Sequence, residues 1–176
     1  MTRVAAGLAA RGVHVRTFDF PYRRAGRSAP DPAPVLEAAF AEAWRDAGAV
    51  FAGGKSMGGR IASQAAARGL LTPPPAGLVF FGYPLHPPGK PGQRRDRHLP
   101  AVGRPMLFVQ GTRDPFGTPE EMTALTDGLG AGASLELIDG GDHSLAAPKR
   151  QDAGGRALER AMDLAARWML ALASRA

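Results

Sequence analysis

The stretch "AGGKSMGGR", residues 52–60, decides the fold because two different kinds of site contain such a sequence. In one interpretation, Gly54-Lys55-Ser56 closes a phosphate-binding loop of the pattern G-x-x-x-x-G-K-[ST]. In the other, the residues from Gly54 to Gly58 form the G-x-S-x-G pattern that surrounds a nucleophilic serine. The residues that precede the stretch distinguish the two.

The phosphate-loop interpretation fails on spacing and on local structure. Its first glycine would have to occupy position 49, which holds Ala49, and Gly48 lies one residue too early. Residues 49–52, Ala-Val-Phe-Ala, also favour a strand, whereas a phosphate cradle needs an open loop of backbone N–H groups. The stretch is therefore not predicted to bind phosphate.

The nucleophile interpretation fits the surroundings of Ser56. A buried strand is predicted over 49–52 and an Ala-rich helix over 57–69, which is the strand–turn–helix context that such a serine requires. The tight turn demands small residues two positions before and after the serine, with Gly53 and Gly59 adding room. We expect the Met57 N–H, at the start of the helix, to stabilise an oxyanion. The pattern also arises by chance in a chain with 23 Gly, but the strand and the helix argue against chance.

Two further residues complete the set that serine catalysis needs. A serine hydroxyl is a weak nucleophile unless a base removes its proton and an acid orients that base. Asp114 follows the predicted strand 106–110, and His143 follows the predicted strand 134–138. Both lie past the carboxyl ends of strands, where open α/β sheets place their ligands, and their order in the chain is the one expected for this fold.

Asp142 is the rival candidate for the acid. It directly precedes His143 in the sequence, and neighbouring side chains in a chain usually point apart. A residue from an adjacent strand end, such as Asp114, can meet the imidazole more readily. We therefore prefer Asp114.

Strands and helices alternate along the chain, which indicates a mostly parallel sheet covered by helices on both faces. The predicted strands are residues 13–20, 49–52, 77–82, 106–110 and 134–138, and the predicted helices are residues 2–11, 35–47, 57–69, 119–128 and 156–173. We expect an α/β fold with about five strands, built as a single domain over residues 1–176. The Pro- and Gly-rich segment 84–104 is predicted to be an irregular, lid-like loop beside the site.

Composition narrows the class of protein. The chain has 176 residues, of which 44% are hydrophobic and 22% charged, and no Cys, so it offers no disulfide, thiolate metal site or cysteine nucleophile. Its net charge of +6 comes mostly from scattered Arg residues, without the interleaved aromatics that stack nucleic-acid bases. We expect no nucleic-acid partner, no membrane span, no metal, no cofactor and a cytoplasmic location.

Five stretches together resemble the α/β-hydrolase superfamily, and within it the dienelactone-hydrolase-like branch that includes testis-expressed protein 30 and the third subunit of the NSL histone-acetyltransferase complex. These stretches are FDFPY (18–22), GGKSMGGR (53–60), GYPLHPPGKP (82–91), VQGTRDPFG (109–117) and DGGDHSL (139–145). The resemblance implies a hydrolase fold with Ser56, Asp114 and His143 as a catalytic triad, in agreement with the analysis of the residues. It implies no particular substrate.

The resemblance also implies a departure. Members of the branch carry, before the helix at residues 2–11, a strand and a His-Gly-rich loop that supplies a second oxyanion donor. The chain therefore resembles an N-terminally truncated member. Loss of one oxyanion donor costs about 3–4 kcal/mol of transition-state stabilisation, so we expect reduced activity. An exposed sheet edge left in this way would favour self-association.

The sequence thus predicts a serine hydrolase that cleaves a small acyl ester, a thioester or a related carbonyl through an acyl-enzyme. Lys55, Tyr83 and Phe116 are further candidates for contacts with the substrate. The alternative is a non-catalytic interaction module that keeps the fold and uses its basic surface or Pro-rich loop.

Overall fold

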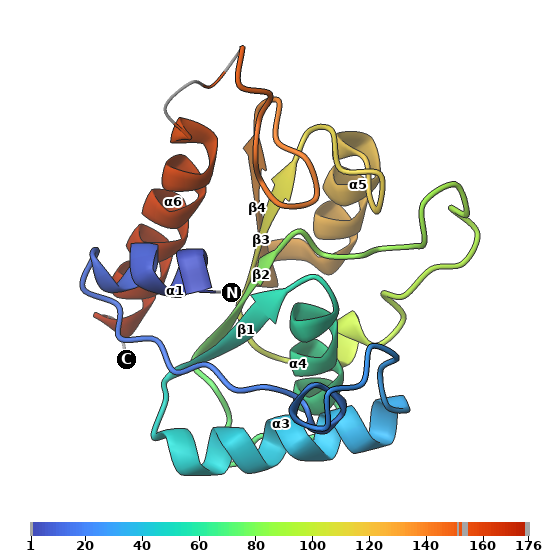
Figure 1. The fold of residues 1–176 in the computed structure, drawn as a ribbon, viewed down its shortest axis with the longest axis vertical. Helices are drawn as coiled ribbons and strands as arrows, with labels where there is room; N and C mark the ends of the chain where they lie inside the picture. The colour runs from blue at the N-terminus through green and yellow to red at the C-terminus, as the bar shows by residue number, and fades with distance from the viewer. Residues whose placement is uncertain (1, 151, 153–154, 175–176) are drawn as a thin grey trace.

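Four parallel strands form the centre of the computed structural model, which describes residues 2–150, 152 and 155–174. The strands are β1 (Phe51–Lys55), β2 (Gly77–Phe81), β3 (Met106–Gly111) and β4 (Ala133–Ile138), and their order in the sheet is β1-β2-β3-β4. All three pairings are parallel, so the carboxyl ends of all four strands lie at one edge of the sheet (Figure 1).

Helices cover both faces of this sheet (Figure 1). α1 (Thr2–Ala9) and α6 (Arg156–Ala173) cover one face, and α3 (Ala33–Ala47), α4 (Met57–Ala67) and α5 (Pro119–Leu129) cover the other. The short elements are α2 (Pro21–Arg24), η1 (Leu99–Ala101) and η2 (Gly130–Gly132). Among the described residues, no helix is both long and apolar enough to cross a bilayer.

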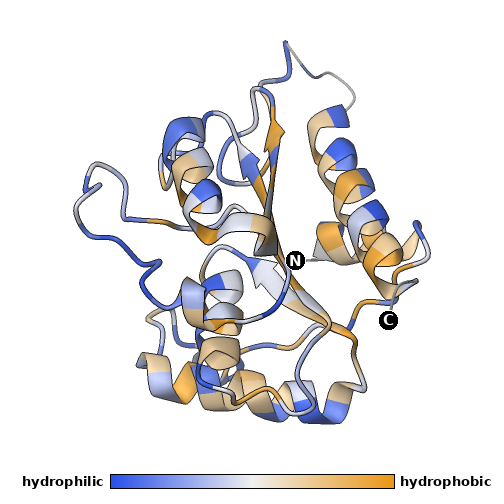
Figure 2. Ribbon diagram, turned by 180° about the vertical axis from the view of Figure 1, so that it is seen from behind, coloured by the Kyte–Doolittle hydropathy of each residue, from blue (hydrophilic) through white to orange (hydrophobic). Residues whose placement is uncertain are grey.

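The central strands are apolar on both sides because helices pack on both sides. Every residue of β2 and β3 is buried. Along β2, Leu78 and Phe80 face the α3–α4–α5 side, whereas Val79 and Phe81 face α1 and α6. Figure 2 shows hydrophobic colour along the central strands, whereas hydrophobic and hydrophilic colours alternate along the helices.

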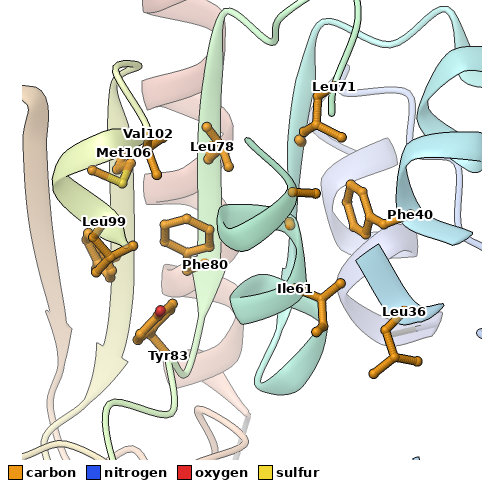
Figure 3. Packing of buried hydrophobic residues seen from close by; sticks show 14 of the residues in the cluster. Leu36, Phe40, Ile61, Leu71, Leu78, Phe80, Tyr83, Leu99, Val102 and Met106 are labelled. Atoms are coloured by element: carbon orange, nitrogen blue, oxygen red, sulfur yellow. The ribbon is translucent and has the colours of Figure 1, made fainter. Parts of the chain in front are cut away.

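Aromatic rings hold the larger core together beneath the carboxyl ends of the strands. The rings of Phe80, Tyr83 and Phe108 lie with their centroids 4.9–5.4 Å apart in tilted or edge-on contacts. Figure 3 shows Phe80 and Tyr83 beside Leu99, which η1 contributes from the far end of the β2–β3 connection. This packing closes the long connection back onto the sheet.

The predicted fold class is confirmed, but the predicted strand over residues 13–20 is wrong. A strand needs a neighbour for its backbone N–H and C=O groups. Residues 14–19 make no backbone hydrogen bond to another described segment. Val13 and Val15 instead pack their side chains against the α1–α6 side of the core. The alternating pattern thus marks an extended segment with one half-buried face, and the sheet has four strands within the described residues.

Smaller differences concern boundaries. β1 begins two residues later than predicted and continues through Gly53 and Gly54 to Lys55. The segment from Gly82 to His98 contains no helix or strand, and it extends away from the sheet beyond α4 and α5 (Figure 1).

Phe80→Ala should lower the free energy of unfolding by about 3–5 kcal/mol, because it empties a fully buried ring site between two other aromatic rings. Leu170→Ala on α6, where the side chain is 49% exposed, is the control and should cost less than about 1 kcal/mol. Urea unfolding of both variants checks this. Equal losses would show that Phe80 is not a core anchor.

Candidate active site

Ser56 lies on a sharp turn between β1 and α4. Its backbone has φ 51° and ψ −124°, a left-handed conformation that a non-glycine residue adopts only when the surroundings enforce it. Its N–H donates to the carbonyl of Phe81 on β2 at 3.0 Å. The turn is therefore anchored to the neighbouring strand, and Ser56 stands before the first turn of α4.

Glycines allow the turn because backbone passes close to backbone. A Cβ on Gly54 would lie 2.8 Å from the carbonyl carbon of Gly58, and a Cβ on Gly59 would lie 2.8 Å from the carbonyl oxygen of Gly54. The same atom on Gly53 would collide with the carbonyl oxygen of Val79. The prediction that position 58 itself must be small is wrong, since a Cβ there would meet nothing within 4 Å.

A chain of hydrogen bonds joins the three residues that the sequence analysis singled out. The Ser56 Oγ lies 2.8 Å from His143 Nε2, and His143 Nδ1 lies 2.8 Å from Asp114 Oδ2. The Asp114 side chain is completely buried, whereas that of His143 is 23% exposed. The loops after β1, β3 and β4 thus bring a hydroxyl, a carboxylate and an imidazole into one line.

The Asp114 carboxylate is held by two further donors. Its Oδ2 accepts from Gln110 Nε2 at 2.8 Å, and its Oδ1 accepts from the Phe116 N–H at 2.9 Å. Gln110 is fully buried on β3, and its Oε1 accepts the Tyr83 N–H at 2.8 Å. The carboxylate is therefore oriented from both sides by groups that are themselves fixed.

Asp142 makes different contacts. Its Oδ1 accepts the N–H groups of Ser144 and Ala146 at 2.7 and 3.1 Å. It shapes the loop that carries His143, whereas the hydrogen bonds of the ring within the described residues go to Ser56 and Asp114. Leu145, with φ 61° and 1% exposure, anchors the same loop in the core on the α1–α6 side.

Of the four remaining predicted site residues, three lie beside the hydrogen-bonded line and the fourth, Tyr83, faces the core. Met57 is the first residue of α4, where a backbone N–H has no partner within the helix. The Phe116 ring stacks on the His143 ring with centroids 4.2 Å apart. Lys55 Nζ lies 2.9 Å from Ser144 Oγ and links the turn to the His143 loop. Tyr83 is completely buried and its hydroxyl donates to the Arg95 carbonyl, so its ring faces the core. Burial raises the pKa of Tyr83.

In a second serine–histidine pair the hydrogen bond runs in the opposite direction, from the ring to the hydroxyl. Ser63 Oγ lies 2.7 Å from His98 Nε2, but Ser63 is fully buried and its hydroxyl donates to the Arg60 carbonyl. Ser63 therefore accepts its hydrogen bond from the ring. Burial, reinforced by the charge of Arg60, lowers the pKa of His98 to about 4, so this ring is neutral at pH 7. The pair is structural.

The two surface hollows beside β4 lie apart from this hydrogen-bonded line. Two surface hollows of about 640 and 760 Å³ flank β4, and neither is lined by Ser56 or His143. In the part of the chain that the structure describes, no group of three or more His, Asp or Glu side chains is arranged to hold a metal ion. The hydrogen-bonded line at the sheet edge remains the candidate site.

Comparison with known proteins agrees with the α/β fold. A family described as "Alpha/beta hydrolase domain" matches residues 1–171. The chain belongs to the α/β-hydrolase family. Its fold is similar to that of the esterase domain of a Rhodothermus marinus protein, with 16% identity and a TM-score of 0.66 over 95% of this chain and 78% of that one.

Two further solved structures share the α/β-hydrolase fold. One is a monoacylglycerol lipase of Paleococcus ferrophilus, with 16% identity and a TM-score of 0.65 over 92% of this chain and 88% of that one. The other is an alpha-beta serine hydrolase homologue of Coxiella burnetii, with 16% identity and a TM-score of 0.59 over 94% and 75%. At such identities the likeness shows the fold, and together with the family it supports a hydrolase.

The sequence analysis missed two residues of this candidate site. Gly82 has φ 61°, and a Cβ on it would lie 2.8 Å from the His143 carbonyl oxygen and 3.3 Å from His143 Nδ1. Gln110 is a buried amide in an otherwise apolar strand. An amide in a buried strand needs polar partners, and that was the available signal for Gln110. Gly82 gave none, because its neighbour comes from a loop 61 positions away.

Gly59→Ala should destabilise the protein more than Gly58→Ala does. The added methyl group at position 59 meets the Gly54 carbonyl and the Phe80 ring at 2.8 and 3.1 Å, whereas position 58 is open. We expect a loss of about 1–3 kcal/mol for Gly59→Ala. For Gly58→Ala we expect no loss, or a gain of up to about 1 kcal/mol from helix propensity. Thermal unfolding compares the two, and a larger loss at position 58 would contradict this description of the turn.

Proposed function

We propose that the protein is a serine hydrolase that cleaves a small acyl ester or thioester through an acyl-enzyme. The observation that carries the proposal is the hydrogen-bonded line Ser56–His143–Asp114, with both contacts at 2.8 Å and the serine in a left-handed turn. The membership in the α/β-hydrolase family supports hydrolysis in general. The five stretches that resemble the dienelactone-hydrolase-like branch support the assignment to serine hydrolases of small acyl substrates.

The chemistry follows from the positions of the three side chains. Ser56 Oγ attacks the carbonyl carbon of the substrate while its proton passes to His143 Nε2. Asp114 orients the ring and stabilises the imidazolium that forms. The tetrahedral oxyanion accepts a hydrogen bond from the Met57 N–H at the start of α4, where the helix dipole also favours negative charge.

Collapse of the tetrahedral intermediate leaves an acyl-enzyme. His143 Nε2 returns the proton to the departing alkoxide or thiolate, and the acyl group stays on Ser56. Water then attacks the acyl carbon with His143 again acting as base, and the acid is released while Ser56 regains its proton. Phe116, stacked on the imidazole, and Lys55, beside the nucleophile, are the side chains proposed to border the acyl group.

A fluorophosphonate probe should label the wild-type protein and fail to label Ser56→Ala, because the probe reacts only with an activated serine. Ser63→Ala is the matched control, since Ser63 also contacts a histidine but is buried and bonded with the opposite polarity. It should be labelled like the wild type. Labelling of Ser56→Ala at the wild-type level would sink the proposal. If neither the wild type nor either variant is labelled, the result would favour a non-catalytic interaction module.

Asp114→Asn should lower kcat for a short-chain p-nitrophenyl ester by up to about 10⁴-fold, because an amide facing Nδ1 favours the wrong tautomer of His143. Asp142→Asn keeps an oxygen for the N–H groups of Ser144 and Ala146, so its kcat should stay within about ten-fold of the wild type. Steady-state kinetics of both variants decides between the two acids. A reversed order would assign the role to Asp142.

A further inference from the structure

His86 lies buried in the segment that follows β2, and both of its ring nitrogens face acceptors. Nδ1 lies 2.8 Å from the Pro87 carbonyl oxygen, and Nε2 lies 2.9 Å from Glu121 Oε2. A carbonyl cannot donate, and neither can an ionised carboxylate, so both nitrogens must carry protons. The geometry therefore describes a positively charged imidazolium, although the side chain is only 5% exposed.

Glu121 is held in its ionised form by its other contact. The same Oε2 accepts the Thr118 N–H at 2.9 Å, as part of the capping box that begins α5. The Thr118 N–H and His86 both lower the pKa of Glu121. The carboxylate therefore serves the cap of α5 and the imidazolium at once.

The charges around His86 come from two elements. α5 contributes Glu121, and the segment of His86 itself contributes Arg94, which is hydrogen-bonded to Asp96 at 3.1 Å. Burial by itself lowers the pKa of His86, but the bonds to Pro87 and Glu121 outweigh burial and raise it above 6.5. The contribution of the charged His86 ring to the stability of the folded protein is therefore complete below about pH 6.5. It is lost as the pH rises through the folded-state pKa of His86.

Backbone and ring contacts connect His86 to the candidate active site. The His86 N–H donates to the Phe116 carbonyl at 3.1 Å. The Phe116 N–H donates to Asp114 Oδ1 at 2.9 Å, and the Phe116 ring stacks on His143 at 4.2 Å. Phe116 thus lies between His86 on one side and the Asp114–His143 pair on the other.

We propose that His86 is a positioning residue whose charged form clamps the start of the lid-like segment to the first turn of α5 and so holds Phe116 against His143. Loss of one ring proton breaks one of the two side-chain bonds, since the nitrogen that becomes an acceptor then faces another acceptor. The clamp opens, Phe116 loses its support, and activity falls at alkaline pH. The effect on activity rests on the proposed hydrolase function, whereas the charge state of His86 does not.

The charge state is tested without catalysis. In Ser56→Ala protein, long-range ¹H–¹⁵N NMR spectra should show two protonated ring nitrogens on His86 at pH 6.5. Glu121→Gln should move the titration midpoint to lower pH, while its amide oxygen can still accept the Thr118 N–H. A His86 ring with a single proton at pH 6 would overturn the proposal.

The effect on the site is tested by the pH dependence of kcat/KM. The wild type should show an alkaline decline that moves to lower pH in Glu121→Gln and is absent in His86→Gln. The kcat of His86→Gln should fall by roughly ten-fold at all pH values, within the 10²-fold that a misplaced group can cost. His14→Gln changes an exposed histidine in the extended segment after α1, and it should behave like the wild type.

The outcomes separate this proposal from the hydrolase proposal. If a fluorophosphonate labels Ser56 but the alkaline decline is the same in wild type, Glu121→Gln and His86→Gln, the positioning role is wrong and the hydrolase stands. If nothing labels Ser56, the hydrolase is wrong, and thermal unfolding then decides the clamp. The melting temperature should fall with rising pH in the wild type more steeply than in His86→Gln, and equal slopes would overturn the clamp.

Discussion

The left-handed turn at Ser56 is the constraint on which the rest of the site depends. A non-glycine residue at φ 51° is unfavourable unless its neighbours leave it no alternative. Here the hydrogen bond to Phe81 fixes the turn from the side of the sheet. The contact of Gly54 with Gly58 and Gly59 fixes it from the side of α4. The strain is held by backbone packing, and the hydroxyl is left at the edge of the sheet.

The parallel sheet converts this local turn into a site. Because all the strands end at the same edge, the loops after β1, β3 and β4 can meet, although Ser56 and His143 are 87 positions apart in sequence. β2 contributes the space between them, since Gly82 at its end leaves room for the His143 ring. The parallel strands therefore bring the three loops to one edge, and the absence of a side chain at Gly82 leaves room for His143.

Polar side chains around the Ser56–His143–Asp114 line hold the members of the line in place. Gln110 is bonded to Tyr83 and to Asp114 inside the core, where an unpaired amide would be costly. Asp142 fixes the His143 loop through backbone N–H groups. His86 and Glu121 form a partly buried ion pair next to Phe116, whose carbonyl accepts the His86 N–H. Hydrogen bonds fix the site on the side of the sheet, and the support that we propose for His86 lies on the side of the lid-like segment.

The sequence by itself determined the strand–turn–helix around Ser56, the two apolar strands that it predicts over residues 77–82 and 106–110, and the candidate acid and base. Each of these leaves a local pattern of periodicity, glycine or position after a strand. Only the tertiary structure decided what depends on a partner distant in the chain. Residues 14–19 make no backbone hydrogen bond to another described segment despite their alternation. Position 58 was open where position 59 was tight, and Tyr83 turned into the core. Asp114 met the imidazole while Asp142 bonded to its own loop, because which side chains meet is set by the convergence of strand ends, and no local pattern records that convergence.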